Sequence, residues 1–341
     1  MKKLLCLRSL LVLLLVLGLI VGGCGSTENA TGSDEENNGE EKITLTLSSS
    51  WPEHALLVVG MPIYKELVEE LSEGKIELKY VGGPEAIPDF EHAEAVRDGT
   101  VDMSFTTGGY YFDSCPEATF VTGYSNMSYP EMRETGAHDW LNEVHIKKMN
   151  SVVLGNAVQG LKFAVYTRKP VYKVEDFKGL RIRATAVYLP MMTALGAEAV
   201  ALPAGDIYSS LERGVVDGFC WNSSGMTDYS LHEQISYAIY PHFMTVNNFI
   251  IINHDKWSSL PGWAQDVLTE AAIKLEELTP PIFEEFVEKE EEIMKAAGVE
   301  FIELEEPEKF LKLIDEANVE YVRKNYPNPE ETLKYLWKPL E

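Results

Sequence analysis

The sequence has few of the residues and motifs on which catalysis or metal binding usually depends. Its 341 residues include four cysteines and seven histidines, and no two cysteines have the Cys-x-x-Cys spacing. There is no Gly-x-Ser-x-Gly turn, no Gly-rich phosphate loop and no His-Glu-x-x-His pair. An enzyme built on one of these local motifs is therefore excluded, although a hydrolase with a dispersed site is not.

Positive charge is also scarce. Lysine and arginine number 29 against 54 aspartates and glutamates, which gives a formal net charge of -25. Such a chain repels nucleic acid and anionic lipid surfaces. It repels an anionic ligand at long range as well, so a site for one must be locally positive.

Long apolar runs are confined to the amino terminus. Lys2, Lys3 and Arg8 precede the run from Leu10 to Val21, which is short for a membrane span, so residues 1–23 are predicted to be an export signal peptide. The following Cys24 completes a Val-Gly-Gly-Cys motif that resembles a bacterial lipobox, which implies a lipid on Cys24. The alternative is an ordinary secretory cleavage site beside an incidental cysteine.

Residues 25–41 contain no large apolar side chain, so they cannot bury enough surface to order themselves. Residues 24–41 are therefore predicted to be a lipidated cysteine and a flexible tether. This predicts an extracytoplasmic protein, on the periplasmic or outer cell surface, anchored to the membrane by its lipid.

The mature chain is long enough for two lobes. Removing 23 residues from 341 leaves 318, and the basic count falls from 29 to 26 against 54 acids, a charge of -28. This length exceeds what one compact core usually holds. A strand at Ile43–Leu47, an amphipathic helix with Ile63, Leu67 and Leu71 on one face, and a strand at Ile76–Val81 form a βαβ unit, so the predicted class is α/β.

A sequence pattern that occurs twice in the chain supports two lobes of similar structure. Residues 95–102 and 210–217 share the pattern small, apolar, charged, charged, Gly, any, Val, Asp. In each copy a helix is predicted to end at the glycine and a strand to start directly after it. The two strands lead to Met103–Tyr111 and to Phe219–Asn222.

The segment from Leu180 to Ala184 alternates apolar and cationic residues. A strand here sends Arg181 and Arg183 to the face opposite Ile182, and Arg183 leaves the sheet at the carboxyl end of the strand. A guanidinium there could bind a carboxylate through two parallel hydrogen bonds. The alternative is a solvated strand face with two surface arginines.

Three segments carry a family resemblance: Asp176–Arg183, Pro203–Tyr208 and Leu211–Gly218. Together they resemble the DctP-type solute-binding proteins of TRAP (tripartite ATP-independent periplasmic) transporters. The resemblance implies a two-lobe periplasmic-binding-protein-like fold with a ligand cleft between the lobes and a long C-terminal helix spanning both. Such a protein delivers a small carboxylate to the integral-membrane permease.

The resemblance also implies how the chain is divided. Residues 42–160 and 247–286 are expected in lobe I, and residues 161–246 and 287–341 in lobe II. The long helix is expected from Pro261 to about Ala297, with Pro280 and Pro281 kinking or splitting it.

The ligand-binding residues are expected to come from both lobes. Arg183 is the expected partner of the carboxylate, and Trp51 and His54 follow the first strand, where both could equally be structural or solvated. Lys162 falls near a second arginine of some relatives, with a solvated strand lysine as the alternative. The full expected set is Arg183, Trp221, Asn222, Thr107, Tyr110, Trp51, His54, Lys162 and Phe243.

Two departures from relatives narrow the expected ligand. Binders of sialic acid have an acidic residue near Thr107, and binders of 2-oxo acids have a glutamate near Cys220 that helps to hold a cation. Their absence favours a 2-oxo, 2-hydroxy or aromatic monocarboxylate bound without a metal or cofactor. Cys115 and Cys220 are expected in different lobes as free thiols, because a disulfide would lock the cleft.

Two other functions stay open. The same fold could load a ligand onto a sensor system, or the chain could be an exported hydrolase. Ligand-dependent closure without turnover separates a binding protein from a hydrolase.

Overall fold

A computed structural model describes residues 42–158 and 160–339. The predicted signal peptide, Cys24 and the tether lie outside the described residues. Within the part described, no helix combines the length and the apolar character that a membrane span requires.

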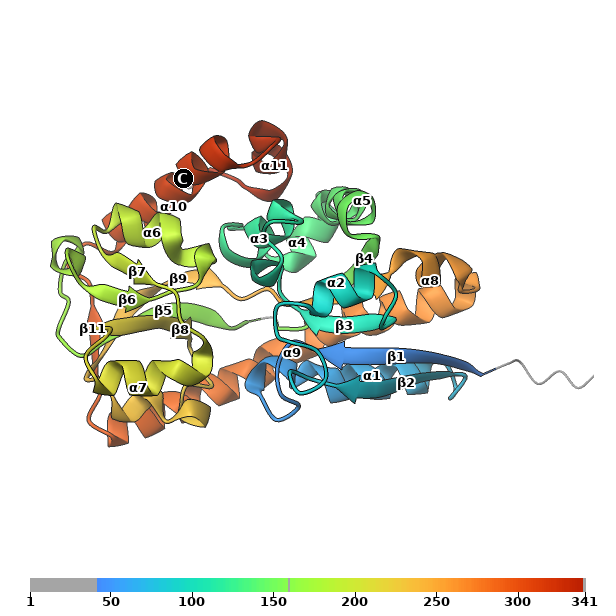
Figure 1. Ribbon diagram of the computed structural model, residues 1–341, viewed down its shortest axis with the longest axis horizontal. Helices are drawn as coiled ribbons and strands as arrows, with labels where there is room; N and C mark the ends of the chain where they lie inside the picture. Colours follow the sequence, from blue (N-terminus) through green and yellow to red (C-terminus); the bar gives the residue numbers. More distant parts are fainter. Residues whose placement is uncertain (1–41, 159, 340–341) are drawn as a thin grey trace, which may run out of the picture. The chain divides into compact units, whose positions relative to one another are not determined.

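The described chain is built on two mixed β-sheets flanked by helices (Figure 1). The first sheet has the strand order β2-β1-β3-β10-β4. Its strands are β1 (Ile43–Ser49), β2 (Ile76–Gly82), β3 (Met103–Thr106), β4 (Ser151–Asn156) and β10 (Phe249–Asn253). As expected for a βαβ unit, β1 is parallel to β2, whereas β10 is antiparallel to its neighbours β3 and β4.

The second sheet has the order β11-β9-β5-β8-β6-β7. Its strands are β5 (Lys162–Thr167), β6 (Arg181–Arg183), β7 (Glu198–Val200), β8 (Gly218–Asn222), β9 (Tyr237–Thr245) and β11 (Glu300–Glu303). Here β6 pairs in parallel with β7 and β8. The α/β class predicted from the sequence is confirmed.

Helices cover both faces of the sheets. Those between β1 and β4 are α1 (Gly60–Leu71), α2 (His92–Arg97), α3 (Pro116–Gly123), α4 (Tyr129–Glu134) and α5 (Ala137–Met149). Those that follow are α6 (Leu189–Ala194), α7 (Ile207–Glu212), α8 (His254–Ser259), α9 (Gly262–Ala296), α10 (Pro307–Asn325) and α11 (Pro329–Leu336).

The side chains of β10 show why its sheet is covered on both faces. Phe249 and Ile251 pack into the core beneath α2–α5, and Ile250 and Ile252 pack into the core beneath α1 and α9. All four are fully buried. This alternation follows from the two-residue period of a strand, and a strand with apolar residues on both faces belongs at the centre of a sheet.

Helix α9 connects the two halves of the fold (Figure 1). Its first half packs Leu268 and Leu275 into the core of the first sheet, and Met294 near its end packs into a core of the second sheet. The predicted long helix that spans both lobes is confirmed. Pro280 and Pro281 do not split it: they remove two backbone donors, but buried side chains on either side of them, including Leu275 and Phe283, hold the helix in place.

Two further segments connect the sheets, namely residues 157–158 and 160–161 between β4 and β5, and residues 246–248 between β9 and β10. They pair with each other: the Ala157 N–H donates to the Asn248 carbonyl (2.7 Å), and the Val246 N–H donates to the Leu161 carbonyl (2.9 Å). The Asn156 side chain joins this pairing by accepting from the Asn248 N–H at 3.0 Å. We refer to these two paired crossing segments as the hinge.

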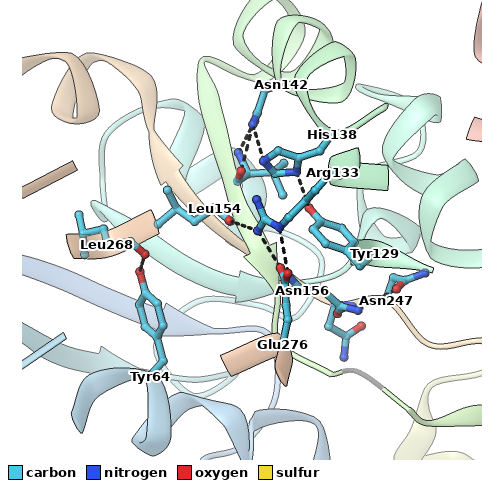
Figure 2. Close-up of polar contacts among 12 residues, drawn as sticks. Tyr64, Tyr129, Arg133, His138, Asn142, Leu154, Asn156, Asn247, Leu268 and Glu276 are labelled. Atoms are coloured by element: carbon cyan, nitrogen blue, oxygen red, sulfur yellow. Dashed lines mark hydrogen bonds and ion pairs between the residues drawn. The ribbon is translucent and has the colours of Figure 1, made fainter. Parts of the chain in front are cut away.

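A buried ion pair braces this hinge (Figure 2). Arg133 donates from two nitrogens to the two carboxylate oxygens of Glu276 at 2.9 and 2.8 Å, and also to the Leu154 carbonyl. Glu276 in turn accepts from the Asn156 N–H at 2.9 Å, and the Asn156 amide donates to Asn247 at 2.8 Å. Helix α9, β4 and the hinge are therefore held by one fully hydrogen-bonded network, which is the condition under which buried charges are tolerated.

The expected lobe boundaries remain a prediction. The contacts at the end of the chain differ from those expected for lobe II. Helix α11, expected in lobe II, lies against α3 and α5, which are flanking helices of the first sheet. Tyr335 stacks on Trp140 with 4.9 Å between ring centroids, and Ser125 donates to the Leu336 carbonyl at 2.7 Å. These aromatic and polar contacts explain why the chain returns to the first sheet.

Candidate functional site

A cavity of about 430 Å3 lies between loops of the two sheets. Its volume is in the range of small-molecule sites. Six of the nine expected ligand-binding residues line it: Trp51, Thr107, Tyr110, Arg183, Trp221 and Asn222. The structure therefore brings residues from distant parts of the chain to one place, at the ends of β1, β3, β6 and β8.

Arg183 is the strongest positive feature of this cavity. It ends β6, where Ile182 pairs with Gly218, so its side chain leaves the sheet at the carboxyl end as expected. Its Nε donates to the Leu202 carbonyl at 3.0 Å, and its guanidinium carbon lies 5.6 Å from the centre of the Trp221 ring. These two contacts orient the guanidinium and leave its terminal nitrogens for a ligand.

Arg183 lacks the partner that a buried charge normally has. The residue is 6% exposed, and no acidic side chain among residues 42–158 and 160–339 forms an ion pair with it. Arg181, two residues earlier, pairs with Asp217 (Nε to Oδ2, 3.1 Å), and the partly buried Lys148 pairs with Glu117 (2.7 Å). Burial lowers the pKa of Arg183, although arginine remains charged. The site therefore presents a desolvated cation that an anion would stabilise.

Two further donors in the cavity wall have no partner. The indole Nε1 of Trp221 and the amide Nδ2 of Asn248 are buried, and neither makes a hydrogen bond within the described chain. Asn248 belongs to the hinge, where its backbone is fixed by Asn156 and Ala157. Buried donors are normally satisfied, so these groups suit a ligand that carries acceptors.

The wall contributed by the first sheet is mainly aromatic. The Trp51 Nε1 donates to the Tyr110 hydroxyl at 3.1 Å, and the two rings are 5.7 Å apart. Phe90, 57% exposed, covers the other side of Tyr110 at 4.6 Å. Burial raises the pKa of Tyr110 to about 12, so its hydroxyl stays protonated and neutral. Thr107 donates to Thr122 at 3.3 Å.

The other three expected residues lie elsewhere. Lys162 and Phe243 line a second hollow of about 460 Å3 beside α10, and Lys162 is exposed. The Phe243 ring lies 6.4 Å from that of Phe163 and 6.2 Å from that of Tyr188, and these two residues line the first cavity whereas Phe243 does not. His54 is exposed, and burial raises the pKa of nearby Asp228 although His54 opposes this rise.

Comparison with known proteins identifies the family. Residues 47–326 match the DctP family, described as bacterial extracellular solute-binding protein, family 7. The chain belongs to this family. Its members are solute-binding proteins of TRAP transporters, which confirms the resemblance inferred from the three segments.

Two curated relatives differ in the ligands that their names state. The chain is 22% identical over 252 residues to a monocarboxylate 2-oxoacid-binding periplasmic protein of Nostoc, covering 72% of this chain and 69% of that protein. It is 25% identical over 261 residues to the C4-dicarboxylate-binding periplasmic protein DctP of Rhodobacter capsulatus, covering 72% and 75%.

Solved structures support the same fold. A TRAP solute-binding protein of Pseudoalteromonas atlantica with bound sodium and pyruvate has a TM-score of 0.73 and 19% identity, covering 87% of this chain and 92% of that one. Another, from Pseudomonas putida with bound D-glucuronate, has a TM-score of 0.71 and 22% identity, covering 85% and 96%. At this identity the likeness establishes the two-lobe fold and not the ligand.

Several lining residues of this DctP-family protein were not expected from the sequence. They are Tyr188, Tyr229 and Asn248, together with the acids Asp89 and Asp228. Asp228 and Tyr229 follow the motif ending at Asn222 by a few residues, so a longer reading of that loop could have found them. Nothing local marks Asp89 or Asn248, because their position depends on the hinge and on the path of a long loop.

The state of Cys115 and Cys220, and the arrangement of side chains that could bind a metal ion, are relevant to the chemistry of the site. Cys115 and Cys220 are both free and buried, in agreement with the expectation of free thiols. Burial raises the pKa of Cys220 to about 12, so this thiol is protonated. Among the described residues, no three His, Cys, Asp or Glu side chains are grouped so that they could hold a metal ion.

The two lobes make a close contact beside the cavity. Val187, in a short 3-10 helix at Ala186–Tyr188, packs against Gly109 and against Gly123 at the end of α3. A Cβ on Gly109 would lie 3.0 Å from Val187 Cγ2, and one on Gly123 would overlap Val187 Cγ1. Gly123 is therefore the residue that this close approach requires.

We expect Gly123→Ala to weaken binding of a carboxylate ligand about tenfold, because the added methyl prevents the lobes from closing fully. Isothermal titration calorimetry measures the affinity. Gly262→Ala, where a Cβ meets no neighbour, is the matched control, and adding Val187→Ala to Gly123→Ala should restore binding. Wild-type affinity in Gly123→Ala alone would show that this contact plays no part in closure.

Proposed function

We propose that this protein captures a small monocarboxylate outside the cytoplasm by closing its two lobes, and delivers it to a TRAP membrane permease. The observation that carries the proposal is Arg183: a guanidinium that is buried in the cavity, oriented by Leu202 and Trp221, and without an acidic partner in the described chain. A carboxylate supplies the missing charge and accepts two parallel hydrogen bonds.

The free energy of this interaction makes it the main contribution to ligand binding. Loss of one partner from a buried, hydrogen-bonded charge pair costs on the order of 2 to 5 kcal/mol, much of it from the charge that stays buried and unpaired. In the unliganded closed form Arg183 is in that unpaired state. Binding of the carboxylate and closure of the lobes should therefore be strongly coupled.

The remaining wall favours a ligand with an apolar or aromatic body. Tyr110, Tyr188, Trp221 and Tyr229 present ring faces, which gain roughly 25 cal/mol per Å2 of apolar area that they bury with the ligand. The unpaired donors of Trp221 and Asn248 suit one additional oxygen. We therefore favour a 2-oxo, 2-hydroxy or aromatic monocarboxylate, a class that includes the ligands named for the Nostoc relative.

We propose that binding needs no metal ion. In the binders of 2-oxo acids that this chain resembles, a glutamate at about the position of Cys220 helps to hold a cation. Cys220 itself is packed in the core as a protonated thiol. Calcium and sodium prefer oxygen ligands, which a thiol does not provide. The partners of the protein are thus the carboxylate, the permease and, through Cys24, the membrane.

We expect Arg183→Lys to weaken carboxylate binding at least about tenfold, because lysine keeps the charge but loses the planar fork. The melting temperature of the unliganded protein should change little. Calorimetry with a panel of monocarboxylates measures the loss. Arg181→Lys is the matched control, since Arg181 lies on the same strand but pairs with Asp217 outside the cavity. Equal affinities in the two variants would remove Arg183 from the site.

We expect Cys24→Ser to release the protein from the membrane into the soluble exported fraction. The reason is that the lipid on Cys24 is the anchor that we propose for the mature chain. Fractionation of cells that export each form, followed by immunodetection, measures the distribution. A Cys6→Ser variant is the control, because Cys6 lies within the predicted signal peptide. Membrane association unchanged by Cys24→Ser would refute the anchor.

A further inference from the structure

The cavity wall carries negative charge as well as Arg183. Asp89 and Asp228 both line it, and neither forms an ion pair within the described part of the chain. Neither is within ion-pair distance of Arg183. A site that only had to accept a carboxylate gains nothing from two additional anions.

The two acids come from opposite lobes and have matching surroundings. Asp89 precedes Phe90 in the loop between β2 and α2, and Asp228 precedes Tyr229 in a 3-10 helix at Thr227–Tyr229 after β8. Each acid is thus followed by an aromatic residue that also lines the cavity. Carboxylates together with aromatic faces are the side chains that recognise an ammonium group.

The loop that carries Asp228 is held firmly in place. Glu290 of α9 accepts hydrogen bonds from the Thr227 N–H and from the Thr227 hydroxyl, both at 2.8 Å. On the other lobe, Phe90 rests on Tyr110 with 4.6 Å between ring centroids. The two acids are therefore presented by anchored elements.

Two tyrosine hydroxyls are within electrostatic reach of both Arg183 and an acid. Burial raises the pKa of Tyr110 and of Tyr229, Asp89 adds to that rise, and Arg183 opposes it. Partial burial also raises the pKa of Asp89 and of Asp228, and for Asp228 nearby His54 and a hydrogen bond from the Leu56 backbone oppose the rise. A cation in the cavity would favour the charged forms of both acids.

We infer that the cavity is bipolar and that its ligand carries, at the end opposite the carboxylate held by Arg183, an ammonium or similar cationic group held between Asp89 and Asp228. The inference rests on the proposed function, because it requires Arg183 to bind the carboxylate. It also gives closure a second source of selectivity. The two acids of opposite lobes line one cavity, where a cationic group would be attracted by both and a second carboxylate would be repelled by both.

The test uses three benzoates that differ at the far end of one ring: 4-(aminomethyl)benzoate, 4-methylbenzoate and terephthalate. Calorimetry on the full folded chain should give the tightest binding to the amino compound, about tenfold over the methyl compound, and the weakest to terephthalate. The straight-chain set of 5-aminopentanoate, pentanoate and glutarate repeats the comparison without the ring.

Variants at Asp89 and Asp228 test the ammonium site separately from the carboxylate site at Arg183. Asp89→Asn and Asp228→Asn should each reduce the preference for the ammonium group to about threefold or less and strengthen terephthalate binding, with the methyl compound unchanged. Asp113→Asn, an exposed acid outside the cavity, is the matched control. An order of affinity that is the same in wild type and in both variants, or terephthalate binding as tightly as the amino compound, would overturn the inference.

The results that would refute the proposed function differ from those that would refute only the bipolar site. If all compounds bind equally in wild type and Arg183→Lys weakens them equally, Arg183 binds the carboxylate and only the bipolar site is refuted. If no compound of either set binds, or if binding is indifferent to Arg183, both the proposed function and the inference are refuted.

Discussion

A guanidinium removed from water without a carboxylate beside it is the constraint on which the rest of the site depends. Transfer of a charge out of water is costly, and folded chains usually offset the cost with a partner, as Arg133 does with Glu276. Within the described residues, Arg183 contacts the Leu202 carbonyl and the Trp221 ring and has no acidic partner. The proposed carboxylate would supply that partner, and its binding would then favour closure of the lobes.

The connections between the two sheets determine how ligand binding at Arg183 would act on the two lobes. Helix α9 and the paired segments at residues 157–158, 160–161 and 246–248 connect the two sheets, and the network of Glu276, Asn156 and Asn247 holds these connections together (Figure 2). The residues that line the cavity therefore come from two sheets joined by these connections. Val187 against Gly109 and Gly123 limits how far the lobes approach.

Much of the framework could be predicted because local patterns determine it. The βαβ unit, the long helix and the position of Arg183 at the end of β6 follow from apolar periodicity and from glycine at helix ends. Motif positions at the ends of strands, such as Thr107 directly after β3 and Trp221 near the end of β8, also reached the cavity wall. These residues need only their own strand to be placed correctly.

Residues whose placement depends on distant packing could not be found in this way. Lys162 and Phe243 lie on β5 and β9, but Phe163 and Tyr188, whose rings are near Phe243, line the cavity in place of Phe243, and sequence alone does not order such layers. Asp89 reaches the wall through a long loop, and Asn248 through the segment between β9 and β10. The lack of acids near Thr107 and Cys220 gave no indication of Asp89 and Asp228 for the same reason.

The measurement that tests the central claim most directly is mass spectrometry of small molecules released from the protein after incubation with a metabolite extract, compared between wild type and Arg183→Lys. The account predicts that the wild-type protein releases a stoichiometric monocarboxylate that is absent or strongly depleted from the variant. Release of a neutral solute or a dicarboxylate from the wild type, or equal release from both proteins, would contradict it.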